Sequence, residues 1–237
     1  MIDVKSVTIK DITAELHHVF NLFNEEFFDG KLPGPAITIQ SNGHRRLAMG
    51  WCSTVPVWGT EDGSVQMYEL NLSAEFLRLD FFEHMDTILH EMVHLFHKVT
   101  GVKDTSRDNA YHNKHFKNKV LELGFEYENN KPDPVHGWTY ARLGKKAKEK
   151  IAGMPINQEI FAISRYGYEY FKAIEEGQKP AALSQVEPVL SEGGDRPAAA
   201  KARSMKWVCP SCGIAVRSYK ANVNLKCMDC EELLEKQ

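Results

Sequence analysis

The sequence lacks a run of about 18 consecutive apolar residues, the length that a membrane-spanning helix requires. Its start, Met1-Ile2-Asp3-Val4-Lys5, has neither the basic beginning nor the apolar core of a signal peptide, and the chain contains no internal repeat. With 43% hydrophobic and 26% charged residues among 237, the composition excludes a wholly disordered chain and a collagen-like one. We therefore expect a globular, cytoplasmic protein with no membrane partner.

The net charge of the chain is small, but its acidic and basic residues are unevenly distributed. The formal net charge is −3, yet residues 1–135 carry 13 Lys and Arg against 20 Asp and Glu, whereas residues 136–237 carry 16 against 12. The first part is therefore acidic and the second basic. The basic part is the better candidate for contacting a polyanion such as DNA, although an excess of four charges is modest by itself.

Cysteine is scarce until the last 29 residues, with only Cys52 before them. The other four follow a C-x₂-C–x₁₄–C-x₂-C pattern: Cys209, Cys212, Cys227 and Cys230. In a chain without a secretion signal, paired cysteines more often bind metal than form disulfides. Two such pairs complete a closed tetrahedral Cys₄ site, so we predict a zinc ribbon built around one structural Zn²⁺. The segment has few apolar residues, and the metal is expected to supply much of its stability.

Hydrophobic periodicity predicts an α+β domain. Apolar residues at helical spacing indicate helices over 11–29 and 81–101, with Asp11 as the expected N-cap of the first. Short strands are expected at 36–40, 47–54 and 65–72, and a further helix at about 112–123. The expected organisation is a domain over 1–145, a basic and aromatic connector with a flexible linker over 146–203, and the zinc ribbon over 204–237.

The second long helix carries an H-E-x-x-H motif, His90-Glu91-Met92-Val93-His94. Residues i and i+4 share one helix face, so His90 and His94 can bind a single Zn²⁺. Glu91 is rotated by about 100° from His90, which places its carboxylate beside the metal. There it can act as general base toward water and then as general acid toward a leaving amine. The motif predicts a catalytic zinc and peptide-bond hydrolysis.

A catalytic zinc needs a third protein ligand and one open position. The downstream candidates are His97, His112, His115, Glu122 and Glu126. His97 lies about 4.5 Å further along the helix than His94, so a ligand from a returning segment is favoured over it. The spacing of the motif alone does not choose between His112 and His115.

The segment from His90 to Phe116, HEMVHLFHKVTGVKDTSRDNAYHNKHF, resembles the SprT-like zinc metalloprotease family, which pairs H-E-x-x-H with a histidine four residues before a phenylalanine. The resemblance implies a zincin-like fold with a small mixed sheet, His112 as third ligand, and a zinc ribbon after the protease domain. It also covers the strand end at 69–73 and Gly137-Trp138. It further implies action on DNA-associated proteins, such as covalent DNA–protein crosslinks.

The sequence thus predicts a zinc metallopeptidase acting on a protein or peptide substrate, with DNA as a further partner through the basic C-terminal region. Strands 47–54 and 65–72 both remain candidates for pairing with an extended substrate. Tyr111 is a candidate oxyanion donor, with core packing as its alternative. The rival function is a nucleic-acid- or protein-binding factor that has a catalytically weak zincin fold and a zinc ribbon.

Overall fold

The computed structural model describes residues 4–41, 48–178, 205–218 and 222–236. The chain divides into two compact units, Met1–Pro188 and Val189–Gln237. Most of the predicted linker, residues 179–203, lies outside the described part of the chain. None of the helices described has the length and the apolar character needed to cross a membrane.

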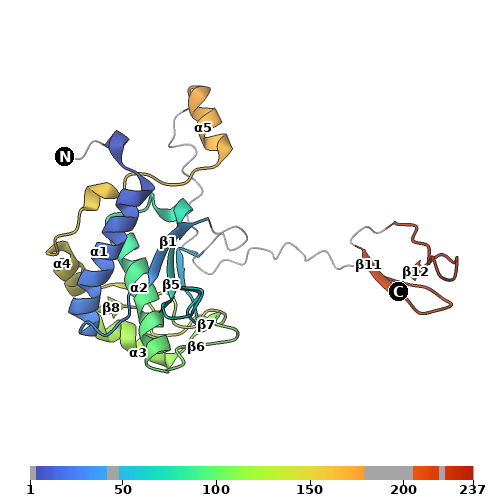
Figure 1. Ribbon diagram of the computed structural model, residues 1–237, viewed down its shortest axis with the longest axis horizontal. Coiled ribbons are helices and arrows are strands. Elements are labelled where there is room, and N and C mark those ends of the chain that lie inside the picture. The colour runs from blue at the N-terminus through green and yellow to red at the C-terminus, as the bar shows by residue number, and fades with distance from the viewer. Residues whose placement is uncertain (1–3, 42–47, 179–204, 219–221, 237) are drawn as a thin grey trace. The chain divides into compact units, whose positions relative to one another are not determined.

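The first unit is built on two long helices that lie side by side on one face of a small sheet (Figure 1). Helix α1 spans Ile9–Phe28 and follows the short 3₁₀ turn η1, Val4–Ser6. The predicted N-cap, Asp11, is wrong by three residues, because Thr8 is the N-cap and Asp11 completes its capping box. The Asp11 carboxylate accepts a hydrogen bond from the Thr8 backbone N–H at 2.8 Å.

The main sheet has three strands in the order β1-β5-β2. Strand β1, Ala36–Gln40, runs parallel to β5, Glu69–Ser73, and β2, Gly50–Cys52, runs antiparallel to β5. Leu70 and Leu72 of β5 are buried in the core that the helices share with the sheet. The mixed α+β architecture expected from the sequence is therefore present.

The predicted strand 65–72 is two strands in the structure. Its first part is β4, Gln66–Met67, which forms a hairpin with β3, Trp58–Gly59. Its second part is β5, which pairs with the main sheet. The segment changes partner at Tyr68, whose carbonyl accepts a hydrogen bond from the Ala36 N–H.

Helix α2, Phe81–Val99, carries the H-E-x-x-H motif. Asp80 caps its N-terminus by accepting hydrogen bonds from the N–H groups of Phe82 and Glu83. Gly101, at φ +70°, follows the C-cap residue Thr100. The apolar face predicted from the sequence is buried, including Met85, Ile88, Leu89, Met92 and Val93.

The remaining elements of this unit are short. After α2 come β6 (Thr105–Ser106), β7 (Tyr111–His112), α3 (Lys114–Glu122), β8 (Phe125–Glu126) and β9 (Arg142–Leu143). The turn η2 (Ala74–Phe76) precedes α2, and α4 (Lys145–Ala152), η3 (Gln158–Ile160) and α5 (Tyr168–Glu175) follow β9. Part of the segment expected to be a connector packs on the same core, since Ile151 is fully buried there.

The second unit has a three-stranded antiparallel sheet in the order β11-β10-β12. Its strands are β10 (Met205–Val208), β11 (Ala215–Ser218) and β12 (Glu235–Lys236). Among the described residues, its buried apolar centre consists only of Cys209, Cys227 and Leu234. So small a core is typical of a unit that a bound metal stabilises.

Candidate functional site

Three histidine rings from two elements meet in the first unit. His90 and His94 lie one turn apart on α2, and His112 comes from β7. The His112 Nε2 atom lies 3.2 Å from His90 Nε2 and 3.0 Å from His94 Nε2. The three rings form a group whose possible ligand atoms all lie within 4.8 Å of one another. The structure therefore brings together the three histidines predicted as ligands.

The placement of His112 depends on the segment that follows Asp133. The His112 N–H donates to the His136 carbonyl at 3.0 Å, and the Trp138 N–H donates to the His112 carbonyl at 3.0 Å. The same His136 carbonyl lies 3.3 Å from His112 Nδ1. Because a carbonyl only accepts, Nδ1 carries the hydrogen and Nε2 presents its lone pair to the other two rings.

His112 was expected at the start of the next helix, but it lies before it. Helix α3 begins at Lys114 because Asn113 is its N-cap and accepts a hydrogen bond from the His115 N–H at 2.7 Å. The His115 side chain is exposed on α3 and is not part of the histidine group. The geometry therefore selects His112 from the two histidines that the spacing left open.

His94 is fixed by Asp104, a residue that the sequence analysis did not identify. Its Nδ1 lies 2.6 Å from Asp104 Oδ2, so this nitrogen also carries the hydrogen. Burial alone would raise the pKa of Asp104, but the hydrogen bond from His94 and the nearby His97 ring outweigh it and hold that pKa below its usual value. The Nε2 atoms of His94 and His112 lie 3.0 Å apart, and with hydrogen on Nδ1 the neutral form of each ring presents its Nε2 lone pair to the other.

This donor set fits a zinc ion. Two facing lone pairs repel each other unless a cation lies between them, and neutral imidazole nitrogen is a preferred zinc ligand. Nitrogens bound tetrahedrally at about 2.0–2.1 Å from zinc are about 3.3 Å apart, close to the observed 3.0 and 3.2 Å. Burial and the neighbouring histidines lower the pKa of His112 to about 3 and that of His90 well below its ordinary value. Both rings are therefore neutral, as metal binding requires.

Glu91 lies beside this group and contacts the sheet. It is 6% exposed, and the backbone N–H of Cys52 in β2 donates a hydrogen bond to its carboxylate. Burial raises the pKa of Glu91 to about 7, against the opposing effects of His94 and this hydrogen bond. The carboxylate is thus held next to the histidines in a poorly solvated position.

The contact between β2 and α2 requires glycine at position 50. A Cβ atom there would lie 2.8 Å from the Asn71 carbonyl oxygen, 2.9 Å from Thr87 Cγ2 and 3.3 Å from Glu91 Cγ. Any larger residue would push the strand away from the helix that carries Glu91. Gly50 therefore allows the close approach through which Cys52 reaches the carboxylate.

The sheet topology distinguishes between the two strands that were candidates for substrate pairing. Strand β5 is central, with β1 on one side and β2 on the other. Among the described residues, β2 pairs only with β5, which leaves its other edge open. The free edge nearest Glu91 is therefore that of β2.

The ring of Tyr111 packs against neighbouring residues. Its ring is half-buried, and the Arg107 guanidinium lies over it at 4.4 Å from the ring centroid. Its Cε1 atom also lies close to the backbone of Gly137. These contacts agree with packing, the alternative considered for this residue.

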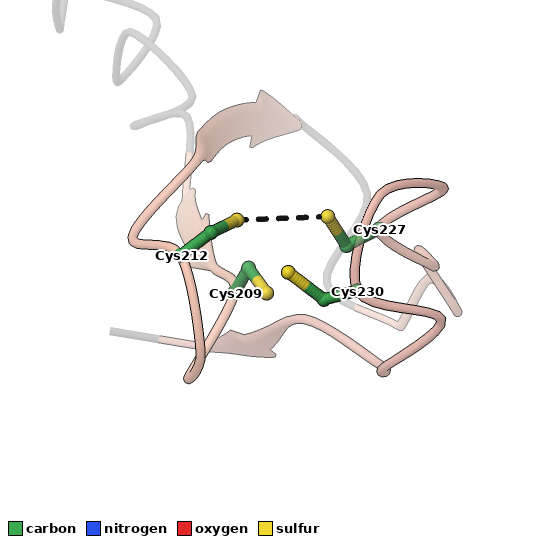
Figure 2. A group of neighbouring side chains, drawn as sticks. All are labelled: Cys209, Cys212, Cys227 and Cys230. Atoms are coloured by element: carbon green, nitrogen blue, oxygen red, sulfur yellow. Dashed lines mark hydrogen bonds between the residues drawn. The ribbon is translucent and has the colours of Figure 1, made fainter.

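A second group of possible metal ligands lies in the C-terminal unit. The side chains of Cys209, Cys212, Cys227 and Cys230 point toward a common centre (Figure 2). Cys212 Sγ and Cys227 Sγ are 3.6 Å apart, and all four sulfur atoms lie within 4.8 Å of one another. Four thiols converging in this way fit a tetrahedral zinc site.

Two backbone turns shape this group. The Gly213 N–H donates to the Cys209 carbonyl, and the Cys209 N–H donates to the Ile214 carbonyl. Gly213 has φ +74°, which glycine adopts without strain. The backbone N–H of Cys212 contributes most to lowering the pKa of Cys209, which favours the thiolate that binds metal.

The SprT-like family model matches residues 16–136, just over half of the chain. The chain belongs to the SprT-like family. The resemblance seen between His90 and Phe116 is thereby confirmed, and the SprT-like match includes Glu91 and all three clustered histidines. The cysteine group lies outside the matched range and is compatible with a zinc ribbon. Searches of curated proteins and of solved structures found no match.

Sequence reasoning missed the residues that hold the SprT-like site in place. Asp104, Gly50 and the His136 carbonyl act through tertiary contacts, and none forms a recognisable spacing with the H-E-x-x-H motif. The only available signal was Gly137-Trp138, which was noted as a family feature without a role. In the structure this pair continues the segment that is hydrogen-bonded to His112.

Proposed function

We propose that this protein is a zinc-dependent peptidase with a zincin-like catalytic domain. The observation that carries the proposal is the convergence of three histidine Nε2 atoms beside the buried residue Glu91. His90, His94 and His112 hold the catalytic ion, and the four cysteines of the second unit hold a structural one.

When bound, zinc acts as a Lewis acid that polarises a peptide carbonyl and makes water more acidic. Glu91 accepts a proton from the attacking water as the new carbon–oxygen bond forms. It then donates that proton to the nitrogen of the leaving amine as the carbon–nitrogen bond breaks. The Cys52 N–H restrains the carboxylate during both transfers.

We assign the extended substrate to the free edge of β2. The Ser53 N–H donates to the Glu69 carbonyl and the Ser73 N–H donates to the Met49 carbonyl, so residues 49, 51 and 53 face β5. The backbone groups of Gly50 and Cys52 therefore point to the open edge. Because Glu91 already accepts from the Cys52 N–H at that edge, a peptide paired with β2 lies next to the catalytic carboxylate.

The test is metal analysis combined with proteolysis of an unfolded protein substrate. We expect two zinc ions in the intact chain, one in His90→Ala and one in Cys209→Ser. Chelation is expected to abolish hydrolysis and added Zn²⁺ to restore it. Hydrolysis that continues in metal-free protein would contradict the proposal, and a fully zinc-loaded chain without hydrolysis would favour the rival binding function.

We further propose that the C-terminal unit contacts DNA. Lys206 and Arg217 are exposed and directly paired across β10 and β11, an arrangement of like charges that suits a polyanion. Lys226 and Lys236 are also exposed in this unit, together with the acidic residues Asp229, Glu231, Glu232 and Glu235. Trp207 packs in part against the cysteine core, and Tyr219, an aromatic residue of the same segment, lies outside the described residues.

Removal of residues 204–237 is expected to weaken DNA binding. The intact chain should lose affinity more steeply with salt, by a slope of about 0.9 for each phosphate that the ribbon contacts. The measurement is a salt titration of duplex binding by the intact and truncated chains. Equal affinity of the two at low salt would rule out the ribbon as a DNA contact.

A further inference from the structure

Asp104 connects the two elements that supply the clustered histidines. It follows α2 and precedes β6, and its side chain is completely buried. Its backbone carbonyl accepts a hydrogen bond from the N–H of Asn113 at 2.9 Å, the residue after His112. Its carboxylate contacts His94 on α2. Asp104 therefore contacts both α2, which carries His94, and the residue that follows His112.

One carboxylate oxygen of Asp104 is hydrogen-bonded to His94 and lies near a second ring, that of His97. Asp104 Oδ2 lies 2.6 Å from His94 Nδ1 and 3.4 Å from His97 Nδ1. The two histidines are three residues apart on α2, so both rings face the same side of the helix. His97, which is 4% exposed, lies outside the group of possible metal ligands, and its Nδ1 atom forms no hydrogen bond in the described part of the structure.

The negative charge of Asp104 has few other partners. Its second oxygen, Oδ1, is buried and forms no hydrogen bond in the described part of the structure. Its ion-pair contacts there are with the two histidines and with no Lys or Arg. A buried carboxylate is costly unless its charge is compensated. A cation bound at the far nitrogen of the His94 ring would supply that compensation.

From this geometry we infer that Asp104 is a positioning residue that sets the metal affinity of the three-histidine site. It holds His94 in the tautomer with hydrogen on Nδ1, and it turns Nε2 toward His90 and His112. A carboxylate partner also makes the imidazole a stronger donor to metal. The inference rests on the proposed metal binding but not on peptidase activity.

The test compares two substitutions in the full-length chain. Asp104→Asn removes the charge at nearly constant size. Asp86→Asn is the matched control, because Asp86 is also buried, at 6% exposure, and accepts a hydrogen bond from the Leu143 N–H at 2.9 Å. No histidine lies within ion-pair or hydrogen-bonding distance of Asp86 in the described residues.

Zinc affinity is measured by competition with a chromophoric chelator, and the histidine site is followed separately by the visible absorption of bound Co²⁺. We expect Asp104→Asn to weaken zinc binding at this site by about 10- to 100-fold and to alter the Co²⁺ absorption. Asp86→Asn is expected to leave both unchanged. The unfolding midpoint of the metal-free chain is measured for each variant to detect a general loss of structure.

Equal zinc affinity in Asp104→Asn and the unsubstituted chain would overturn the inference. So would an affinity loss matched by a proportional loss of metal-free stability, because that result indicates a purely structural role. Unchanged affinity in an active peptidase would leave the proposed function standing. A 10- to 100-fold loss in a chain that binds zinc but hydrolyses nothing would support the role of Asp104 and remove the peptidase proposal.

Discussion

Glu91→Gln is expected to lower the rate of peptide hydrolysis by about 100- to 10,000-fold while leaving the zinc content unchanged. The amide keeps the size of the side chain and still accepts a hydrogen bond from the Cys52 N–H. It cannot take a proton from water or return one to the leaving amine. The measurement is the initial rate of proteolysis by zinc-matched protein.

Glu83→Gln is the matched control for this variant. It makes the same chemical change on the same helix, in the first turn of α2 and away from the histidine group. We expect it to retain the full rate. Proteolysis at the original rate in Glu91→Gln would show that another group carries the proton, and the proposed mechanism would fail.

Gly137→Ala is expected to displace His112 and to weaken zinc binding at the histidine site by more than about 100-fold. This effect is larger than that expected for Asp104→Asn, because Asp104 contacts only the Nδ1 atom of the ligand His94. Gly137 has φ +69°, and a Cβ atom there would lie 2.1 Å from the His112 carbonyl oxygen. No ordinary contact is this short, so the 136–138 segment must move away from β7. Proteolysis should fall with the zinc content.

Gly101→Ala separates the effect of this close approach from that of backbone conformation. Gly101 has nearly the same angle, φ +70°, but nothing lies within 4 Å of a Cβ atom there. The Gly101→Ala substitution should lower the free energy of unfolding by about 1 kcal/mol, because alanine is strained in the left-handed conformation, and it should leave zinc binding unchanged. If both alanine variants bind zinc like the unsubstituted chain, Gly137 does not position His112. Zinc binding and thermal unfolding of the two variants decide this.

Local sequence patterns predicted much of the fold. The apolar spacing between residues 81 and 99 gave the correct helix, and the i, i+4 spacing of His90 and His94 placed them on one face of it. The cysteine spacing brought four thiols together in the second unit. These predictions succeeded because each depends on contacts within a few residues or on a short closed turn.

Errors occurred where an element depends on a distant partner. The predicted strand 65–72 divides at Tyr68 because its two halves pair with different strands. His112 lies on a short strand before α3 because residues 136–138 hold its backbone. Neither partner is visible in the local pattern. The N-cap of the first helix was wrong for a different, local reason: Thr8 lies before the apolar repeat, and Asp11 is the N3 residue of its capping box.

The sequence by itself determined the chemistry available to this protein: the H-E-x-x-H motif, a downstream histidine, four paired cysteines and no long apolar run. Only the tertiary structure decided which histidine completes the group, which strand edge lies beside Glu91, and that Asp104 holds His94. Motif chemistry is encoded by residue type and spacing along one element. Convergence of ligands, open edges and buried partners depends on packing between segments far apart in the chain, which spacing does not encode.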